Sequence, residues 1–242
     1  VVLQFANNVL GTRHDVLALV AAARAAAPQA LIALDACQGA GKAAIDLHAL
    51  GVDAAAFAGH KFGAPKGTGL LYLRAGVRLP ALIDGGRQQQ GRRSGTEDAA
   101  AWAALAAALD AWCDRLPAEA ERQAALLDAM VARLRAQRPQ LIDLGAGAPR
   151  LANTRCLALP GARGDVLVQR LDLDGVAVSV GSACMARAGG ASHVVVALGR
   201  GDAIARGALR VSIGWRTTAD DLERFVAAYQ RATGTASGGA VR

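Results

Sequence analysis

The sequence has few features of a metal-binding, membrane or secreted protein. Its four cysteines form no C-x-x-C pair and show no tight spacing with the four histidines, which argues against a zinc knuckle. It contains no apolar run long enough to cross a bilayer. Its N-terminus lacks the basic segment and apolar stretch of a secretory signal. We therefore expect a cytoplasmic enzyme with no metal site.

Lysine and aromatic residues are also scarce. The only lysines are Lys42, Lys61 and Lys66, and aromatic residues make up 4% of the chain. The net charge of +7 comes from arginines that are spread along the sequence rather than gathered in a run, so we expect no direct nucleic-acid partner. Hydrophobic residues make up 53% of the 242 positions, which excludes disorder and predicts one large or two modest domains.

Short apolar runs alternate with helical patterns in the first 75 residues. The pattern predicts strands at Val1–Ala6, Ala30–Ala36, Asp53–Ala58 and Gly69–Arg74, with helices at Asp15–Ala27 and Ile45–Leu50. Such alternation implies parallel β–α–β units, in which ligands bind beyond the carboxyl ends of the strands. This rule directs attention to Asn7–Asn8, Asp35–Gln38 and His60–Lys61.

The second half begins with a nearly continuous helical pattern from Asp98 to Gln137, with a break predicted at Pro117. Beyond it the sequence predicts strands at Thr154–Leu159, Val176–Ser179 and Leu209–Ile213, and helices at Asp165–Leu173, Ser192–Leu198 and Ala219–Ala232. Thr218, with Asp221 three residues later, is a predicted start for the last helix. We place the domain boundary between residues 115 and 116.

The glycine-flanked segment G-H-K-F-G-A-P-K-G-T-G is the most informative stretch of the chain. It is not a phosphate-binding Walker loop, because Lys66 precedes Gly67. What remains is Lys61 on a tight turn directly after an apolar strand. Burial at a strand end lowers the pKa of a lysine and frees its amine to form a Schiff base with a carbonyl. A solvated loop lysine is the alternative.

Asp35 ends the otherwise apolar strand A-L-I-A-L-D. A buried carboxylate is costly unless it meets a cation or serves as a cap. One interpretation is therefore a turn cap. The other is an ion pair with a protonated ring nitrogen, which pyridoxal phosphate requires together with a lysine Schiff base.

Two further residues are candidates for chemistry. Cys184 lies in the glycine-rich segment S-V-G-S-A-C-M-A-R, with Arg187 nearby, and a thiol in a mobile, partly cationic loop is a candidate nucleophile. We expect Cys113 and Cys156 to be ordinary buried cysteines, and Cys37 to pack near the site. Arg210 lies inside an apolar strand and needs an anionic partner, either a ligand carboxylate or a structural salt bridge.

Six motifs, taken in order, resemble those of the cysteine desulfurases, in the class V aminotransferase group of the fold-type I pyridoxal phosphate enzymes. They are N-N at 7–8, D-A-C-Q at 35–38, G-H-K-F-G-A-P-K-G at 59–67, R-S-G-T-E at 93–97, G-S-A-C at 181–184 and L-R-V-S-I-G at 209–214. The resemblance implies an α/β fold. Residues 1–115 would form an incomplete cofactor-binding large domain with a mainly parallel sheet. Residues 116–242 would form a small α+β domain with the catalytic-cysteine loop.

The resemblance also implies an activity and a set of site residues. The enzyme would remove sulfur from L-cysteine, leave L-alanine, and hold a persulfide for an iron–sulfur scaffold or tRNA-thiolation protein. The implied catalytic residues are Lys61, which holds pyridoxal 5'-phosphate, and Cys184, which attacks the substrate sulfur. The implied cofactor contacts are Asn8, Asp35, Gln38, His60, Lys61 and Thr96, the last reaching the phosphate of a neighbouring subunit in a homodimer. The implied substrate contacts are Asn8 and Arg210.

Some positions depart from the family pattern. The family usually has an acidic residue at the positions of Val9 and Gln89, and a hydroxyl residue at the position of Ala58. The first residues already have the pattern of a strand, so we expect an N-terminally truncated chain that lacks part of its cofactor pocket and exposes an apolar sheet edge. Another class V activity, such as selenocysteine lyase or aminotransferase, and an inactive remnant are the alternatives.

Overall fold

The computed structural model describes residues 1–181 and 192–234. These divide into two compact units. Unit 1 comprises Val1–Phe5 and His14–Leu116, and unit 2 comprises Ala6–Arg13 together with the chain from Pro117. No helix among the described residues is both long and apolar enough to cross a membrane.

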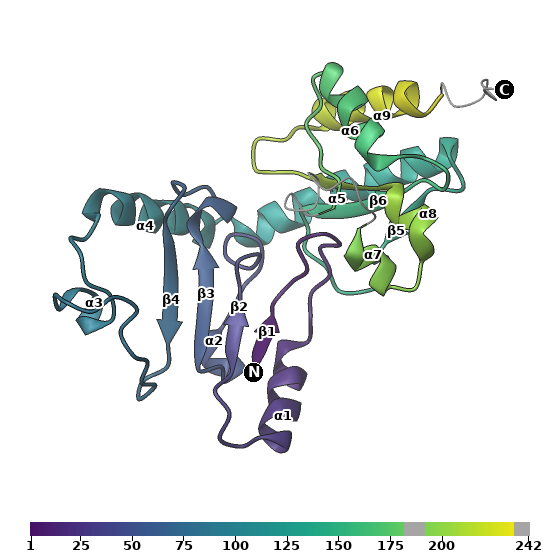
Figure 1. Ribbon diagram of the computed structural model, residues 1–242. Helices are drawn as coiled ribbons and strands as arrows, with labels where there is room; N and C mark the ends of the chain where they lie inside the picture. Colours follow the sequence, from purple (N-terminus) through teal and green to yellow (C-terminus); the bar gives the residue numbers. More distant parts are fainter. Residues whose placement is uncertain (182–191, 235–242) are drawn as a thin grey trace. The chain divides into compact units, whose positions relative to one another are not determined.

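Unit 1 is built on a four-stranded sheet flanked by helices (Figure 1). Its elements are β1 (Val2–Gln4), α1 (Val16–Ala26), β2 (Ala33–Asp35), α2 (Leu47–Leu50), β3 (Ala54–Ala58), the 3₁₀ turn η1 (Gly59–Lys61), β4 (Gly69–Leu73), α3 (Gln88–Gly91) and α4 (Ala99–Cys113). The strand order is β1-β2-β3-β4, with β1–β2 and β2–β3 parallel. The sheet is thus mainly parallel, as expected, but β4 runs antiparallel to β3, because the short connection through η1 turns the chain straight back.

Local chemistry explains why these elements form. Asp15 caps α1 by accepting a hydrogen bond from the Ala18 N–H at 3.0 Å, and the helix buries Val16 and Val20. In β2, Leu34 is buried while Asp35, at the strand end, is exposed. This strand therefore buries its central apolar side chain and leaves its last, polar one at the carboxyl edge of the sheet.

Unit 2 contains an antiparallel sheet of order β5-β6-β7. Its elements are α5 (Leu116–Gln137, whose first residue belongs to unit 1), β5 (Ile142–Leu144), β6 (Thr154–Ala158), α6 (Gly164–Leu173), α7 (His193–Ala197), α8 (Gly201–Arg206), β7 (Ala208–Ser212) and α9 (Ala219–Gly234). The apolar faces of α5, α6 and α9 form its largest core with the sheet, around Leu127, Leu171 and Tyr229.

The start of α9 is as expected from the sequence. Thr218 and Asp221 bond reciprocally: the Thr218 N–H donates to the Asp221 carboxylate at 2.9 Å, and the Asp221 N–H donates to the Thr218 hydroxyl at 3.2 Å. This capping box satisfies backbone donors that the first turn of a helix leaves without partners.

Several expectations about elements were wrong. Residues 176–179 form no strand; Ser179 makes only an isolated bridge to Arg210, so the segment lies beside the sheet without extending it. The long helical pattern breaks at residues 114–115 rather than at Pro117, which lies in the first turn of α5, where its missing N–H costs nothing. The strand β5 and the short helices α3 and α8 were not predicted.

The expectation for Cys113 was also wrong, because this residue is exposed at the end of α4, whereas Cys156 is buried as expected. α4 packs through Leu105 and Trp112 instead: Leu105 is buried against Phe62, and the Trp112 indole donates to the Phe62 carbonyl at 2.8 Å. The alanine-rich helix therefore contacts the turn after η1 without the cysteine.

Candidate functional site

The carboxyl ends of β2 and β3 bring together most of the predicted unit 1 residues. Asp35 ends β2, Gln38 follows it by three residues, and His60 and Lys61 form η1 directly after β3. Asp35 and Lys61 are both exposed, and neither forms an ion pair with another described residue. A carboxylate and an amine, neither of them in an ion pair with a described residue, thus lie at one edge of the sheet.

The Asp35 carboxylate is held in place by the backbone. Its Oδ1 accepts a hydrogen bond from the Cys37 N–H at 3.0 Å. The Ala36 N–H in turn donates to the Ala56 carbonyl at 3.0 Å, which ties the end of β2 to β3. Asp35 therefore forms a turn cap, which is one of the two interpretations of its place in the sequence.

Cys37, two residues after Asp35, has a perturbed thiol. The pKa of this thiol is raised to about 11, first by burial and then by the hydrogen bond and the charge of the Asp35 carboxylate, whereas the Lys61 ammonium lowers it. Both charges therefore act on one half-buried thiol. This thiol is protonated at neutral pH, and the sequence indicated only that Cys37 packs nearby.

The turn that carries Lys61 depends on Gly59. The Gly59 N–H donates to the Thr68 carbonyl at 2.9 Å, and its carbonyl accepts from the Phe62 and Ala64 N–H groups at 3.1 Å each. A Cβ at this position would lie 2.3 Å from the Thr68 hydroxyl and 2.8 Å from a Leu105 methyl group. A larger residue would have to move that packing, and Lys61 with it.

Gln38 has a partner that sequence reasoning missed. The Lys42 ammonium donates to the Gln38 side-chain carbonyl. This interaction leaves the Gln38 amide N–H₂ as the group able to donate to a ligand. The spacing of four residues across a glycine-containing turn, G-A-G-K, is the signal that could have suggested it.

Arg210 and Asn8 meet in unit 2. An Nη of Arg210 donates to the Asn8 backbone carbonyl at 2.9 Å, and the Asn7 side chain fixes the loop by accepting from the Val9 and Leu10 N–H groups. The Arg210 Nε is buried and has no hydrogen-bond partner among the described residues. Burial lowers the pKa of this guanidinium, since its charge is poorly solvated. No described carboxylate forms an ion pair with Arg210, so the structure does not support the salt-bridge interpretation. The buried guanidinium is suited to bind an anion.

Other predicted residues are less constrained. His60 is exposed within η1, and Thr96 is exposed in the loop before α4. Cys184 lies outside the described residues. The predicted domain division also differs from the compact units in one respect, because residues 6–13, with Asn8, belong to unit 2.

The departures from the family pattern have visible local roles. Val9 is fully buried in an apolar cluster with Leu144 and Cys156, where a carboxylate would be costly. Gln89 adopts a left-handed backbone with φ of 53°, and its side-chain amide donates to Glu97 at 2.8 Å. Left-handed backbone is unusual for a residue other than glycine.

Comparisons with known proteins agree with one another. The family model described as aminotransferase class-V matches residues 1–225. A cysteine desulfurase from Rhodobacter capsulatus is 38% identical over 229 residues, covering 93% of this chain and 57% of that protein. A solved NifS-like protein superposes with a TM-score of 0.86 at 30% identity, covering 95% of this chain and 59% of the other. A structure described as SspA in complex with cysteine gives 0.70 at 26% identity, covering 88% and 58%. The chain thus spans little more than half the length of these relatives.

Proposed function

Because the chain belongs to the class-V aminotransferase family, we propose that it carries the Schiff-base lysine and the substrate-binding arginine of a pyridoxal phosphate-dependent cysteine desulfurase. The observation that carries the proposal is the pair of unpaired charges, Asp35 and Lys61, at the carboxyl edge of the unit 1 sheet. It is supported by the unsatisfied Arg210 Nε in unit 2. L-Cysteine is the proposed substrate.

The residues present fit the cofactor. Asp35 offers a fixed, unpaired carboxylate to a protonated ring nitrogen, and Lys61 offers an amine to an aldehyde. Gln38, Asn8 and His60 are the proposed further contacts, and Thr96 is proposed to reach the phosphate of a neighbouring subunit, which requires a homodimer. When bound, pyridoxal phosphate supplies an electron sink for carbanions at the substrate.

The roles of the chain's own groups follow from their chemistry. Arg210 would bind the substrate carboxylate through guanidinium donors other than the one that bonds the Asn8 carbonyl. Lys61 would hold the cofactor, and its amine would be placed to accept a proton from the substrate α-carbon. The Cys184 thiolate attacks the substrate sulfur. The carbon–sulfur bond breaks with its electron pair going to carbon, and protonation there gives alanine, while the sulfur remains as a Cys184 persulfide.

A capture experiment tests the lysine assignment. The purified chain is incubated with pyridoxal phosphate, reduced with borohydride and mapped by peptide mass spectrometry. We expect the stable adduct on Lys61 and its loss in Lys61→Ala, with Lys66→Ala as the matched control that keeps it. An adduct on Lys42 or Lys66 in its place would contradict the assignment.

A second measurement tests the nucleophile. Alanine and persulfide are quantified after addition of L-cysteine to the cofactor-loaded chain. Cys184→Ala should retain the adduct on Lys61 but form no persulfide, whereas Cys113→Ala should match the unmodified chain. Persulfide formation by Cys184→Ala would refute the assignment and favour another class V activity, such as selenocysteine lyase or aminotransferase.

An inactive remnant is the second candidate. It is favoured by Val9, Ala58 and Gln89, which depart from the family pattern. This candidate predicts no lysine adduct at all in the capture experiment. The sulfur acceptor, an iron–sulfur scaffold or a tRNA-thiolation protein, and a cytoplasmic location are further parts of the proposal.

A further inference from the structure

The end of α4 contacts both turns that carry proposed cofactor residues. The first, which we call the lysine turn, is residues 59–62 after β3, and the second, the glutamine turn, is residues 38–42 after β2. Trp112, near the end of α4, packs against the apolar cluster between this helix and the lysine turn, and so does Ala40 of the glutamine turn. Figure 1 shows α4 at the edge of the unit 1 sheet where β3 ends. A helix that carries no proposed site residue thus meets both turns.

Trp112 is bonded directly to the lysine turn. Its indole N–H donates to the Phe62 carbonyl at 2.8 Å. Phe62 is buried and follows Lys61 directly, and its own N–H donates to the Gly59 carbonyl at 3.1 Å. The lysine turn is therefore closed by one hydrogen bond and fixed to α4 by another.

Gly41 brings the glutamine turn onto the same two side chains. Its backbone is left-handed, with φ of 69°, and the residue is buried. A Cβ at Gly41 would lie 2.7 Å from the Phe62 Cβ and 3.1 Å from the nearest carbon of the Trp112 ring. The glutamine turn thus lies directly against Phe62 and Trp112, with no room for a methyl group between them.

We propose that Trp112 is a positioning residue for Lys61: by bonding the Phe62 carbonyl and packing beside Gly41, it holds the lysine turn against the glutamine turn. Trp112 acts through Phe62 and is not proposed to touch the cofactor. The inference rests on the proposed function for its consequence, which is that the Lys61 amine is kept in place to react with an aldehyde.

Hydrogen exchange of the purified chain without cofactor tests the contact. Trp112→Phe keeps an aromatic ring but removes the N–H donor. Trp102→Phe makes the same change at a 39% exposed position of the same helix, whose indole donates to no described residue. Loss of one net hydrogen bond changes an opening equilibrium about fivefold, so residues 59–64 should exchange about fivefold faster in Trp112→Phe and at the original rate in Trp102→Phe. Equal exchange in the two variants would overturn the proposal.

A third variant separates the hydrogen bond from packing. In Trp112→His, the imidazole Nε2 takes the place of the indole nitrogen, two bonds from Cγ, but the side chain is smaller than phenylalanine. Measured at pH 8, where histidine is neutral, its exchange should lie within about twofold of the unmodified chain. Exchange as fast as in Trp112→Phe would show that ring volume alone matters, and would refute the bonding role.

A pair of glycine variants tests the contact with the glutamine turn. Gly41 and Gly51 both have φ of 69°, so alanine strains the backbone alike at either position. A Cβ at Gly51 would meet only a Val20 methyl group at 3.9 Å. Gly41→Ala should therefore speed exchange of residues 59–64 by about fivefold or more, and Gly51→Ala should not. Equal effects of the two variants would contradict the contact.

The capture experiment with pyridoxal phosphate tests the consequence. Adduct formation on Lys61 should be about fivefold slower in Trp112→Phe, close to the original rate in Trp112→His, and unchanged in Trp102→Phe. Faster exchange with an unchanged rate of adduct formation would show that Trp112 only stabilises the turn, and would overturn its positioning role. An unmodified chain that forms no adduct on Lys61 refutes the proposed function instead, and the exchange rates then decide by themselves whether Trp112 holds the lysine turn.

Discussion

At the scale of single residues, the charges around Cys37 provide a direct test of the site. The Asp35 carboxylate raises the pKa of this thiol and the Lys61 ammonium lowers it. We therefore predict that Asp35→Asn lowers the thiol pKa below about 11 and speeds alkylation of Cys37 by iodoacetamide, while Lys61→Ala raises the pKa and slows alkylation. The pH dependence of the alkylation rate, followed by peptide mass spectrometry, measures both effects.

Two variants serve as controls for this experiment. Asp84→Asn and Lys66→Ala make the same charge changes at exposed loop positions, and neither residue affects the Cys37 pKa. They should leave the alkylation profile unchanged. If Lys61→Ala also leaves it unchanged, the amine does not lie beside the thiol, and the proposed cofactor site loses its geometric basis.

At the scale of elements, the Asp53 side chain links three segments: α1, the chain just before β2, and the chain just after β4. The sequence analysis did not identify this structural role. Its side chain is buried before β3, where it accepts hydrogen bonds from the Ile32 N–H at 2.7 Å and from Arg24 of α1 at 2.5 Å. It also forms an ion pair with Arg74, directly after β4. Burial alone would raise the pKa of this carboxyl, but the hydrogen bond from Ile32 and the two guanidinium ions lower it overall.

This arrangement predicts an acid-sensitive unit 1. Because the folded pKa of Asp53 is lower than the unfolded value of about 3.9, its stabilisation is complete above that pH and is lost as the pH falls through the folded pKa. Asp53→Asn should lower the free energy of unfolding by about 3 kcal/mol near neutral pH and flatten its acid dependence. Urea unfolding at several pH values measures both. Asp84→Asn, which breaks no ion pair, should do neither, and an equal loss in both variants would contradict the account.

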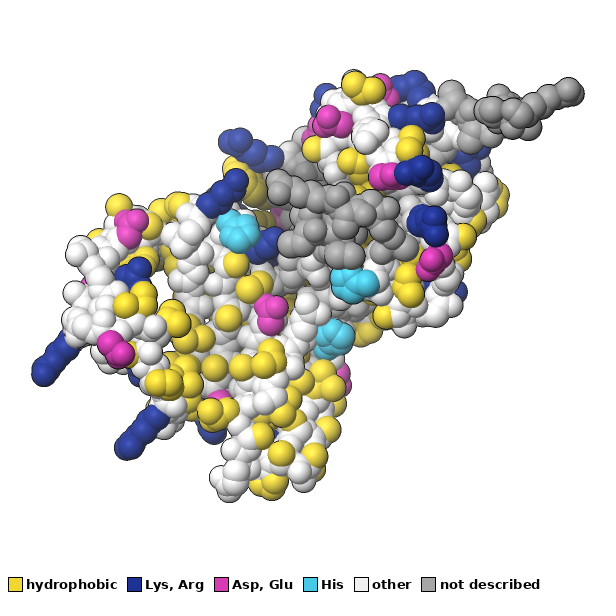
Figure 2. Space-filling view, viewed as in Figure 1, with side chains coloured by type: hydrophobic (Ala, Val, Ile, Leu, Met, Phe, Trp, Pro, Cys, Tyr) yellow, Lys and Arg dark blue, Asp and Glu magenta, His cyan; other side chains and the backbone are white. Residues whose placement is uncertain are grey.

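At the scale of the whole molecule, β1 is one of the two outer strands of the sheet described for unit 1, and Val2 within it is 78% exposed. Figure 2 shows hydrophobic side chains gathered over this sheet and α1. Leu17 and Leu19 of α1, and Leu31 shortly before β2, are exposed. An unpaired edge beside an apolar surface is a template for association with another chain.

We therefore predict concentration-dependent self-association of the chain through this edge. Val2→Lys should reduce it, because a charge on an edge strand disfavours pairing. Leu173→Lys changes a side chain that is 88% exposed at the end of α6, outside the strands of unit 1, and should leave association unchanged. Sedimentation velocity over a concentration series distinguishes the two. An equal reduction by both variants would show that general surface hydrophobicity, not the strand edge, drives association.

Local pattern was enough to place most elements of the fold. Short apolar runs predicted β2, β3, β6 and β7 to within a few residues, since such a run depends on neighbouring positions alone. This reasoning was wrong at residues 176–179, where an apolar run meets the sheet at a single bridge. It also missed β5, which is three residues long and pairs with β6.

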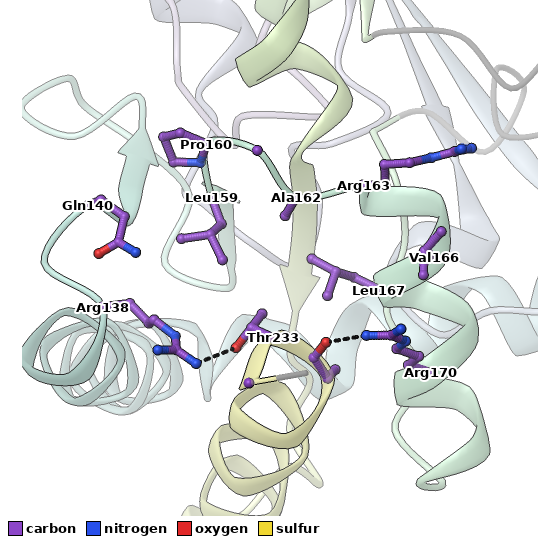
Figure 3. A pocket seen from close by; sticks show the side chains of 13 residues that line it. Arg138, Gln140, Leu159, Pro160, Ala162, Arg163, Val166, Leu167, Arg170 and Thr233 are labelled. Carbon is purple, nitrogen blue, oxygen red and sulfur yellow. Dashed lines mark hydrogen bonds between the residues drawn. The ribbon is translucent and has the colours of Figure 1, made fainter. Parts of the chain in front are cut away.

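What the sequence by itself determined is the order of strands and helices and the polar residues that end the strands, Asp35 and Lys61 among them. Backbone propensity and side-chain periodicity are encoded over short stretches of chain, so they can be read there. Only the tertiary structure decided that Asn8 belongs with Arg210 in unit 2, that Asp53 is held by Arg24 and Arg74, and that Arg138 and Arg170 line one cavity of unit 2 (Figure 3). Contacts between residues far apart in the chain depend on how elements pack, and no local pattern specifies that packing.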